Sequence, residues 1–245
     1  MPSPIFKTRL ATCEADIRAA QRLRYEVFVE EMGAKASEAD HAERLERDQF
    51  DAHFDHLILL VGTRVIGAYR LMRSDMAAKG IGFYSAAEFD LSKLENRSAL
   101  ELGRSCVAKD YRGGAGMHLL WDALGDYVTR HKVEVLFGVA SFSGTRIAPL
   151  KHALTFLHHK YLAPEDLRVC SKAYESLDQM AWEAVDQRAA VKDIPPLIRA
   201  YLRLGGFVGD GAFIDHGFNT VDVCLIMDTT RMVQRYKDYY SKERG

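Results

Sequence analysis

The spacing of apolar residues along the chain predicts an alternation of strands and helices. A period of two favours strands, and apolar residues three or four positions apart favour helices. One helical repeat follows Thr12, a residue type that caps helices, and stops near Gly33. We expect strands at residues 5–11, 57–61, 64–72, 102–107, 133–140, 168–172 and 220–227, and helices at 13–33, 117–128, 145–159, 195–204 and 231–242.

Two adjacent strands should form a β-hairpin, because Gly62-Thr63 separates two apolar runs. In the second of these strands Ile66, Ala68 and Arg70 share one face. An arginine between apolar neighbours needs a carboxylate partner if it is buried. Arg70 is therefore a candidate site residue.

The first helix and the run after it carry many charges. Arg24, Phe28 and Glu31 lie along one helix face if the helix is regular, and spacing alone favours a solvated ion pair between Arg24 and Glu31. Residues 34–54 are charged and weakly periodic, so we expect solvated surface there, either a short helix or a mobile cap near 33–55.

The stretch from Glu101 to Gly116 predicts a strand, a glycine-rich turn and the start of a helix. The first N–H groups of such a helix suit a phosphate or pyrophosphate, although an ordinary βα turn that binds nothing has the same pattern. Glu101 and Gly103 should share one face of the strand, with Arg104 on the other. After the next strand, the hydroxyls of Ser141 and Ser143 are either site groups or turn residues.

Composition narrows the class of protein. The 245 residues, 48% hydrophobic and 27% charged, fit one large soluble α/β domain, and no repeat or linker suggests more than one. A net charge of −1 argues against general nucleic-acid binding. The four scattered cysteines indicate free thiols in a reducing compartment, and three histidines near 152–159 lack zinc-site spacing, so we expect no metal. Without a signal peptide or a long apolar run, a cytoplasmic location is expected.

The order of elements resembles the Gcn5-related N-acetyltransferase (GNAT) fold, an α/β fold with a mixed central sheet flanked by helices. A polar set is also similar in order and spacing to that of acyl-homoserine-lactone synthases: Arg24, Phe28, Asp48, Asp51, Arg70, Glu101 and Arg104. Longer motifs resemble the L-ornithine Nα-acyltransferases: Glu101-Leu-Gly-Arg-Ser-Cys-Val107, Leu157-His-His-Lys-Tyr-Leu-Ala-Pro164, Pro195-Pro-Leu-Ile-Arg-Ala-Tyr-Leu-Arg-Leu-Gly-Gly-Phe207 and Asp215-His-Gly-Phe-Asn-Thr220.

This resemblance implies an N-acyltransferase that moves a 3-hydroxyacyl chain from acyl carrier protein to the α-amino group of ornithine. Catalytic roles would fall to Glu101 as first choice of base, Asp51 as second, and Arg104. The donor's acyl-phosphopantetheine, with no tightly bound cofactor, would contact Val107, Arg112, Gly113, Gly114, Ala115 and Gly116. Substrate contacts are expected from Arg24, Phe28, Asp48, Arg70, Ser141 and Ser143.

Other donors, acceptors and functions stay open at this level. Ala115 and Met117 stand where the acetyltransferase pattern prefers glycine and a small residue, which favours a pantetheine with one phosphate over coenzyme A. Another amino acid acceptor, or a non-catalytic membrane-active protein related to the hemolysin-like branch, is the alternative. An acidic carrier would meet Lys109, Arg112, Arg130 and Lys132, which we expect around the mouth of the pantetheine channel. Five basic residues and three tyrosines at 231–244 suit peripheral contact with an anionic membrane, or a solvated terminal helix.

Overall fold

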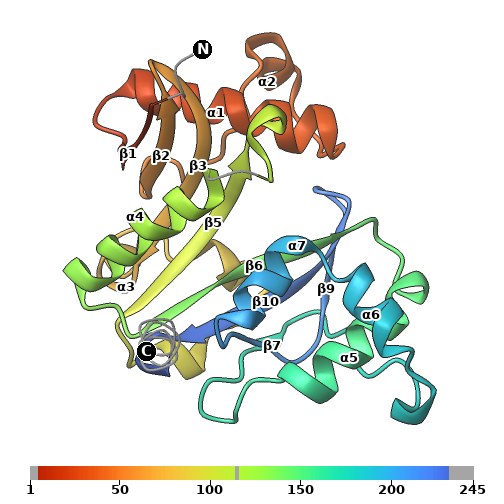
Figure 1. Cartoon of the computed structure of the whole chain (residues 1–245). Helices are drawn as coiled ribbons and strands as arrows, with labels where there is room; N and C mark the ends of the chain where they lie inside the picture. Colours follow the sequence, from red (N-terminus) through yellow and green to blue (C-terminus); the bar gives the residue numbers. More distant parts are fainter. Residues whose placement is uncertain (1–4, 114–115, 232–245) are drawn as a thin grey trace, which may run out of the picture. The chain divides into compact units, whose positions relative to one another are not determined.

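The structure is a computed structural model that describes residues 5–113 and 116–231 (Figure 1). The chain folds into two compact units. The first unit comprises Met1–Gly82 and Glu101–Lys132, and the second comprises Phe83–Leu100 and Val133–Gly245. The single acyltransferase domain expected from the sequence stays a prediction.

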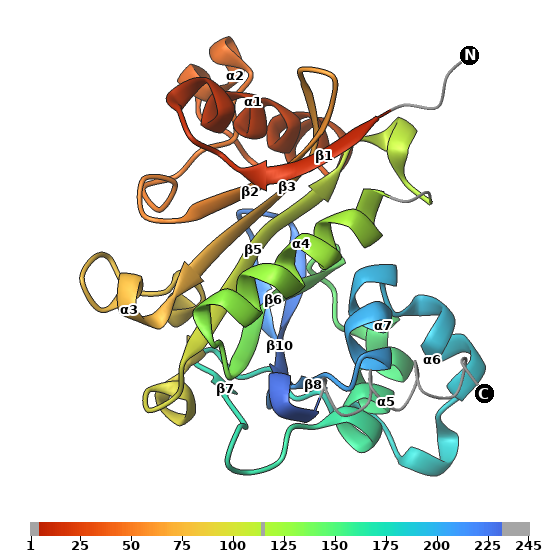
Figure 2. The same cartoon turned by 60° about the vertical axis from the view of Figure 1, so that its left-hand side comes forward.

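The first unit contains a β-hairpin, a strand on either side of it and two main helices (Figure 2). Its strands follow the order β1-β2-β3-β5. The elements are β1 Phe6–Leu10, α1 Glu14–Arg24, the π-helix η1 Tyr25–Glu31, α2 Glu38–Glu43, β2 Asp55–Val61, β3 Arg64–Arg73, α3 Ser74–Ala77, β5 Ala99–Val107, η4 Lys109–Tyr111 and α4 Gly116–His131. The first two residues of β5 belong to the second unit.

Strand β3 shows why helices cover both faces of this sheet. A Cβ at Gly67 would lie 3.0 Å from Cδ1 of Leu120, so α4 packs closely on the face that Gly67 shares with Tyr69. Because side chains alternate along a strand, Arg70 points to the opposite face. That face meets α1, which also packs against β3. The predicted hairpin is confirmed, and Arg70, which needs a carboxylate partner if it is buried, is 1% exposed.

The helix predicted at 13–33 is confirmed in position but is not regular throughout. After Arg24 it widens into a π-helix, in which the N–H of Met32 bonds the carbonyl of Val27. Its N-cap is Cys13, without a side-chain cap, rather than Thr12. The extra residue per turn changes which side chains share a face. The predicted solvated pair between Arg24 and Glu31 is consequently wrong.

In the residues that the structure describes, the second unit contains an antiparallel group of four strands, further short strands and three α-helices. Strand β10 pairs with β6 on one side and with β8 and β9 on the other. The elements are η2 Tyr84–Ala87, β4 Phe89–Asp90, η3 Ser92–Leu94, β6 Val135–Ser143, η5 Ala148–Leu150, α5 Lys151–Tyr161, β7 Cys170–Ser171, η6 Trp182–Ala184, α6 Gln187–Asp193, α7 Pro196–Arg203, β8 Phe207–Val208, β9 Phe213–Asp215 and β10 Thr220–Asp228.

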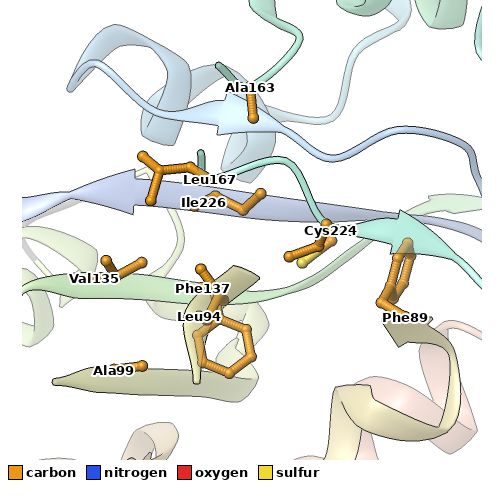
Figure 3. Packing of buried hydrophobic residues seen from close by; sticks show 10 residues of the cluster. Phe89, Leu94, Ala99, Val135, Phe137, Ala163, Leu167, Cys224 and Ile226 are labelled. Atoms are coloured by element: carbon orange, nitrogen blue, oxygen red, sulfur yellow. The ribbon is translucent and has the colours of Figure 1, made fainter. Parts of the chain in front are cut away.

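One face of the β6–β10 pair anchors the hydrophobic core of this unit. Phe137 on β6 lies opposite Ile226 on β10, and both pack with Phe89, Leu94 and Leu167 from the surrounding segments (Figure 3). The long apolar runs of β6 and β10 are the reason that both strands are recognisable in the sequence.

The remaining sequence predictions were met in part. The helix expected at 145–159 starts only at Ala148 as a 3₁₀ turn, and the strand expected at 168–172 is reduced to Cys170–Ser171. Most of the helix predicted at 231–242 lies outside the described residues. Among the residues that the structure describes, no helix has the length and apolarity needed to cross a membrane.

Candidate active site

Six charged side chains of the first unit form a connected cluster. Three are arginines and three are carboxylates, so their charges balance: Arg24, Arg70, Arg104, Glu46, Asp48 and Asp51. They come from α1, from the segment between α2 and β2, and from β3 and β5. Five of the six belong to the polar set singled out in the sequence.

Arg24 lies at the centre of this cluster and is completely buried. Its Nε donates to Glu46, and its two terminal nitrogens donate to the Asp51 carboxylate at 2.7 and 3.2 Å. Burial lowers the pKa of Arg24, but the charges of Glu46 and Asp51 outweigh this effect and raise it. Arg24 is therefore a fixed positive charge that connects α1 to two carboxylates, rather than a surface residue.

Asp51 accepts hydrogen bonds from several donors at once. Besides Arg24, these are Nη1 of Arg70 at 2.8 Å and Nε2 of Gln21 at 2.8 Å. Burial by itself raises the pKa of Asp51, but the two arginines lower it far below its ordinary value. A carboxylate so strongly stabilised in its ionised form is a poor proton acceptor. Its geometry argues against the role of base that the sequence resemblance gave Asp51 as second choice.

The segment 34–54, expected to be solvated surface, supplies much of this buried cluster. Glu46 and Asp51 are buried. Leu45, which directly precedes Glu46, is fully buried. Burial raises the pKa of Glu46, but Arg104 and Arg24 lower it more. These contacts are not visible in the sequence of the charged run, because its partners lie on elements 19 to 58 residues away. Whether the segment moves as a cap stays a prediction.

Arg104 reaches the cluster because β5 is irregular at this residue. Its backbone has φ = +50°, a left-handed conformation that is uncommon for a residue with a side chain. Its Nε donates to Glu46 at 3.0 Å and its Nη2 to Asp48 at 3.2 Å. Asp48 also binds Arg70, at 2.6 Å. Regular alternation predicts that Arg104 points to the strand face opposite Glu101, but its left-handed backbone breaks this alternation and turns its side chain to the cluster.

Glu101 lies on the same sheet face as the cluster. A Cβ at Gly103 would lie 4.0 Å from Nε of Arg70, so the Gly103 face of β5 is turned toward Arg70. Glu101 precedes Gly103 by two residues in β5 and shares this face. Its side chain is 1% exposed. A carboxylate in so dry a position, beside a charge-balanced cluster, fits a group that exchanges a proton with a bound substrate.

The glycine-rich turn is held to the end of β5 by Arg112. The Nε of Arg112 donates to the carbonyl of Val107 at 2.8 Å, and both terminal nitrogens donate to Glu31 at 2.7 and 3.0 Å. Gly113 has φ = +74°, which favours glycine, and Gly116 starts α4 against Val107 and Leu59. Gly114 and Ala115 lie outside the described residues.

The basic residues expected around one channel mouth do not lie together. Lys109 and Arg112 precede α4, whereas Arg130 and Lys132 stand at its other end. A helix of 16 residues is about 24 Å long, so the two pairs are separate. Only the pair next to the glycine turn stays a candidate for contact with a carrier protein.

The other candidate residues are not members of the charged cluster. Phe28 is half-buried in the π-helix η1. Ser141 and Ser143 are on β6 in the second unit, not in a turn beyond it, and pair with Asp222 and Thr220 of β10. Cys106 and Cys224 are buried free thiols, as predicted, and burial raises the pKa of Cys106 to about 12.

Sequence reasoning missed three members of the site. Glu46 bridges two arginines, Gln21 supports Asp51, and the buried His56 ring bonds the Asp51 carbonyl with Nε2 at 2.9 Å. Glu46 has no periodic signal within its charge run. His56 does have one, because it stands at the start of an apolar strand, where a polar side chain needs a buried partner.

Comparisons with known proteins place this fold among the GNAT acyltransferases. The model of the acetyltransferase (GNAT) domain matches residues 23–122. Among solved structures, FeeM, an N-acyl amino acid synthase from uncultured soil microbes, shares 10% identity, with a TM-score of 0.56 over 94% of each chain. A CoA-dependent acyl-homoserine lactone synthase, MesI, shares 12% identity, with a TM-score of 0.51 over 94% of this chain and 95% of the other. These likenesses confirm the predicted α/β fold.

Sequence relatives define the family more narrowly. The L-ornithine N(alpha)-acyltransferase of Rhodobacter capsulatus is 52% identical, with 97% of this chain and 95% of the relative covered. The protein of the same name from Brucella abortus is 42% identical, with 97% and 89% covered. The chain belongs to the L-ornithine N(alpha)-acyltransferase family, and it is an acyltransferase, as its sequence motifs predicted.

Proposed function

We propose that this enzyme transfers a 3-hydroxyacyl chain from acyl carrier protein to the α-amino group of L-ornithine, with lyso-ornithine lipid as the product. The observation that carries the proposal is the 52% identity, over nearly the full length of both chains, to a protein named L-ornithine N(alpha)-acyltransferase. The buried Glu101 and the charge cluster of the first unit supply groups that suit this chemistry.

Amide formation needs a free amine. The α-ammonium of the acceptor loses a proton, its nitrogen attacks the thioester carbonyl, and the carbon–sulfur bond breaks to release the thiol of the pantetheine arm. We assign the proton transfer to Glu101, because Asp51 is held in its ionised form by two arginines. A positioned carboxylate contributes on the order of 10²–10⁴ to such a rate.

The thioester oxygen gains negative charge during the attack, and a backbone N–H near the end of β5 would stabilise it. The N–H of Ala108 bonds the carbonyl of Ile66 on β3 at 2.8 Å. Consecutive N–H groups of an extended strand point to opposite edges. The N–H of Val107 therefore points away from β3. A donor in this role contributes roughly 10²–10³ in rate.

The acceptor's carboxylate needs a guanidinium, and Arg104 is the best placed of the three arginines in the cluster. Arg24 and Arg70 are buried almost completely, whereas 11% of the Arg104 side chain is exposed. Arg24 and Arg70 then serve to hold Asp51, and Asp48 and Glu46 hold the Arg104 guanidinium in position. We therefore propose that Arg24 and Arg70 position other site residues, instead of contacting the substrate directly as the sequence resemblance implied.

The donor is best tested by offering one acyl chain on two carriers. Purified protein is supplied with the same 3-hydroxyacyl group on acyl carrier protein or on coenzyme A, with ornithine, lysine, glutamine, glycine or tyrosine as acceptor. We expect acyl-ornithine by mass spectrometry, formed faster from the carrier protein. Faster transfer from coenzyme A would contradict the proposed donor. Preference for another amino acid would contradict the proposed acceptor.

Contact with a membrane surface is part of the proposal, because a product with one long acyl chain leaves water readily. Residues 231–244 contain five basic and two acidic residues and three tyrosines, a composition suited to an anionic headgroup layer. The test is co-sedimentation with anionic and neutral vesicles, with and without residues 231–245. Equal recovery on both vesicle types would remove this part of the proposal.

A further inference from the structure

The end of strand β5 is held by a guanidinium group from the turn that follows it. The turn η4 reverses the chain, since the N–H of Arg112 bonds the carbonyl of Lys109 at 3.3 Å. The side chain of Arg112 thereby returns to β5, where its Nε donates to the carbonyl of Val107 at 2.8 Å. This contact closes the turn on the last residue of the strand.

A second contact fixes the other side of the same guanidinium. Nη1 and Nη2 of Arg112 donate to the two carboxylate oxygens of Glu31 at 2.7 and 3.0 Å, a bidentate geometry that orients both partners. All three nitrogens of Arg112 therefore bind groups of this chain. Glu31 stands 81 residues before Arg112, and the proposed function assigns it no role.

Glu31 reaches the turn from a helix of unusual geometry. It is the last residue of the π-helix η1, whose extra residue per turn places it on a different face from Arg24. Helix irregularities of this kind occur frequently at functional sites. The side chains of Arg112 and Glu31 are 42% and 31% exposed, and exposed ion pairs add little to stability. The pair is better explained by its effect on the strand end than by the stability of the fold.

The carbonyl that Arg112 binds lies beside the expected position of the oxyanion. A trans peptide points the carbonyl of Val107 opposite to the N–H of Ala108, which bonds β3, so this carbonyl points away from β3. The N–H of Val107 points to the same edge, and the proposed function places the thioester oxygen on it. Partial negative charge on the carbonyl opposes negative charge on that oxygen. A hydrogen bond from a guanidinium offsets this effect and adds positive charge nearby.

The orientation of the ion pair suits this purpose. The Nε edge of the guanidinium faces β5 and its Nη edge faces Glu31, so the positive group lies between the strand and the carboxylate. Arginine has a long side chain with high rotamer freedom, and Glu31 holds it in one orientation. A lysine, with one nitrogen, cannot make the same three contacts.

The geometry points to Glu31 as a positioning residue for acyl transfer. It holds Arg112 on the carbonyl of Val107, and the fixed guanidinium favours the oxyanion that forms at the N–H of the same residue. The inference rests on the proposed function, from which it takes the thioester donor and the place of the oxyanion. It assigns Arg112 to the strand end, whereas the sequence resemblance assigned this residue to the donor's pantetheine arm.

The test measures single-turnover acyl transfer at saturating ornithine, so that product release does not limit the rate. One 3-hydroxyacyl group is supplied on acyl carrier protein, on coenzyme A and on pantetheine, which has no phosphate. Varying the donor concentration gives the maximal rate and the half-saturating concentration separately. For Glu31→Gln we expect the maximal rate to fall by about 10-fold with all three donors, because a displaced guanidinium acts less on the transition state. The half-saturating concentrations should stay close to those of wild type.

Two further variants connect this loss to Arg112. Arg112→Lys keeps the charge but has one nitrogen in place of three, so it should lower the maximal rate at least as much. Adding Glu31→Gln to Arg112→Lys should cause no further loss, since both changes break the same chain of contacts. Glu30→Gln is the control, because Glu30 precedes Glu31 in η1 and forms an exposed pair with Arg44 at 2.8 Å. Its rate should equal that of wild type, and melting curves verify that each variant is folded.

Two results would overturn the inference. One is a wild-type maximal rate in folded Glu31→Gln with every donor. The other is a change limited to the half-saturating concentrations of the two phosphate-bearing donors, since Arg112 would then bind the donor's phosphate.

The same measurements separate this inference from the proposed function. If wild type prefers coenzyme A or another amino acid, the proposed donor or acceptor is wrong. A loss of maximal rate in Glu31→Gln with those substrates would still support the inference. If wild type forms acyl-ornithine from acyl carrier protein and Glu31→Gln is equally fast, the inference fails and the proposed function stands.

Discussion

Nε of Arg104 lies 3.0 Å from a carboxylate oxygen of Glu46, although 58 residues separate them in the chain. This contact depends on the left-handed backbone of Arg104, which turns its side chain out of the regular alternation of β5. The same Glu46 binds the buried Arg24 through its other oxygen. A single carboxylate thus joins α1 to the strand that carries Glu101, and this connection leads to the first prediction.

Replacing Arg24 with methionine should destabilise the protein strongly. The change leaves Glu46 and Asp51 buried with fewer partners, and removal of one member of a buried ion pair typically costs about 3–5 kcal/mol. The measurement is urea-induced unfolding at pH 7.5. Arg18→Met is the matched control. Arg18 lies on the same helix as Arg24 and forms an exposed ion pair with Glu43 of α2. Similar unfolding midpoints for both variants would contradict the structural role of Arg24.

Glu101→Gln should fold normally and lose activity. Glutamine keeps the shape of the side chain but accepts no proton, so turnover at neutral pH should fall by on the order of 10²–10⁴. If deprotonation of the amine is the only role, part of the rate returns at high pH, where free amine is abundant. The measurement is the pH dependence of acyl transfer to ornithine, with a melting curve to verify folding. A near-wild-type rate would end the candidacy of Glu101.

His56 should make stability depend on pH between about 7.5 and 5.5. Burial lowers the pKa of His56 in the folded protein, whereas an unfolded histidine titrates near pH 6.5. As the pH falls below that value, the unfolded chain binds a proton that the folded chain does not, so stability is lost. The slope from this one group is at most about 1.4 kcal/mol per pH unit.

The measurement for His56 is the free energy of unfolding in urea at pH 7.5, 6.5 and 5.5. His56→Gln should have a flatter dependence than wild type across this range. The lowered pKa of His131 contributes equally to both proteins, so the difference between them isolates His56. Parallel curves would show that His56 does not keep its neutral form in the folded state.

Lys109→Glu should slow transfer from acyl carrier protein and leave transfer from coenzyme A much less affected. Lys109 is exposed beside the glycine turn, and an acidic carrier would be repelled by the new charge. The effect should shrink as salt is added, because salt screens exposed charges. Arg130→Glu, at the far end of α4, is the control. Equal effects of the two variants would place the carrier elsewhere.

Several parts of this protein follow from its sequence because their signals are local. Apolar runs predict the hairpin of β2 and β3 and the long strands β6 and β10. The glycine-rich turn predicts the start of α4. The need of Arg70 for a carboxylate partner, if it is buried, also follows locally, since its neighbours on the strand are apolar. Whole-chain motifs predicted the acyltransferase family, which sequence relatives confirm.

Tertiary structure alone decided how the charges combine. Glu46 is one acid among many in a charged segment, and only the fold places it between Arg24 and Arg104. The π-helix after Arg24 and the left-handed backbone at Arg104 redirect side chains that regular periodicity assigns to other faces. Glu31 and Arg112, which stand 81 residues apart, likewise meet only through the packing of η1 against the turn after β5. The physical reason is that periodicity records which side chains are buried, whereas the partner of a buried charge is chosen by contacts between distant segments.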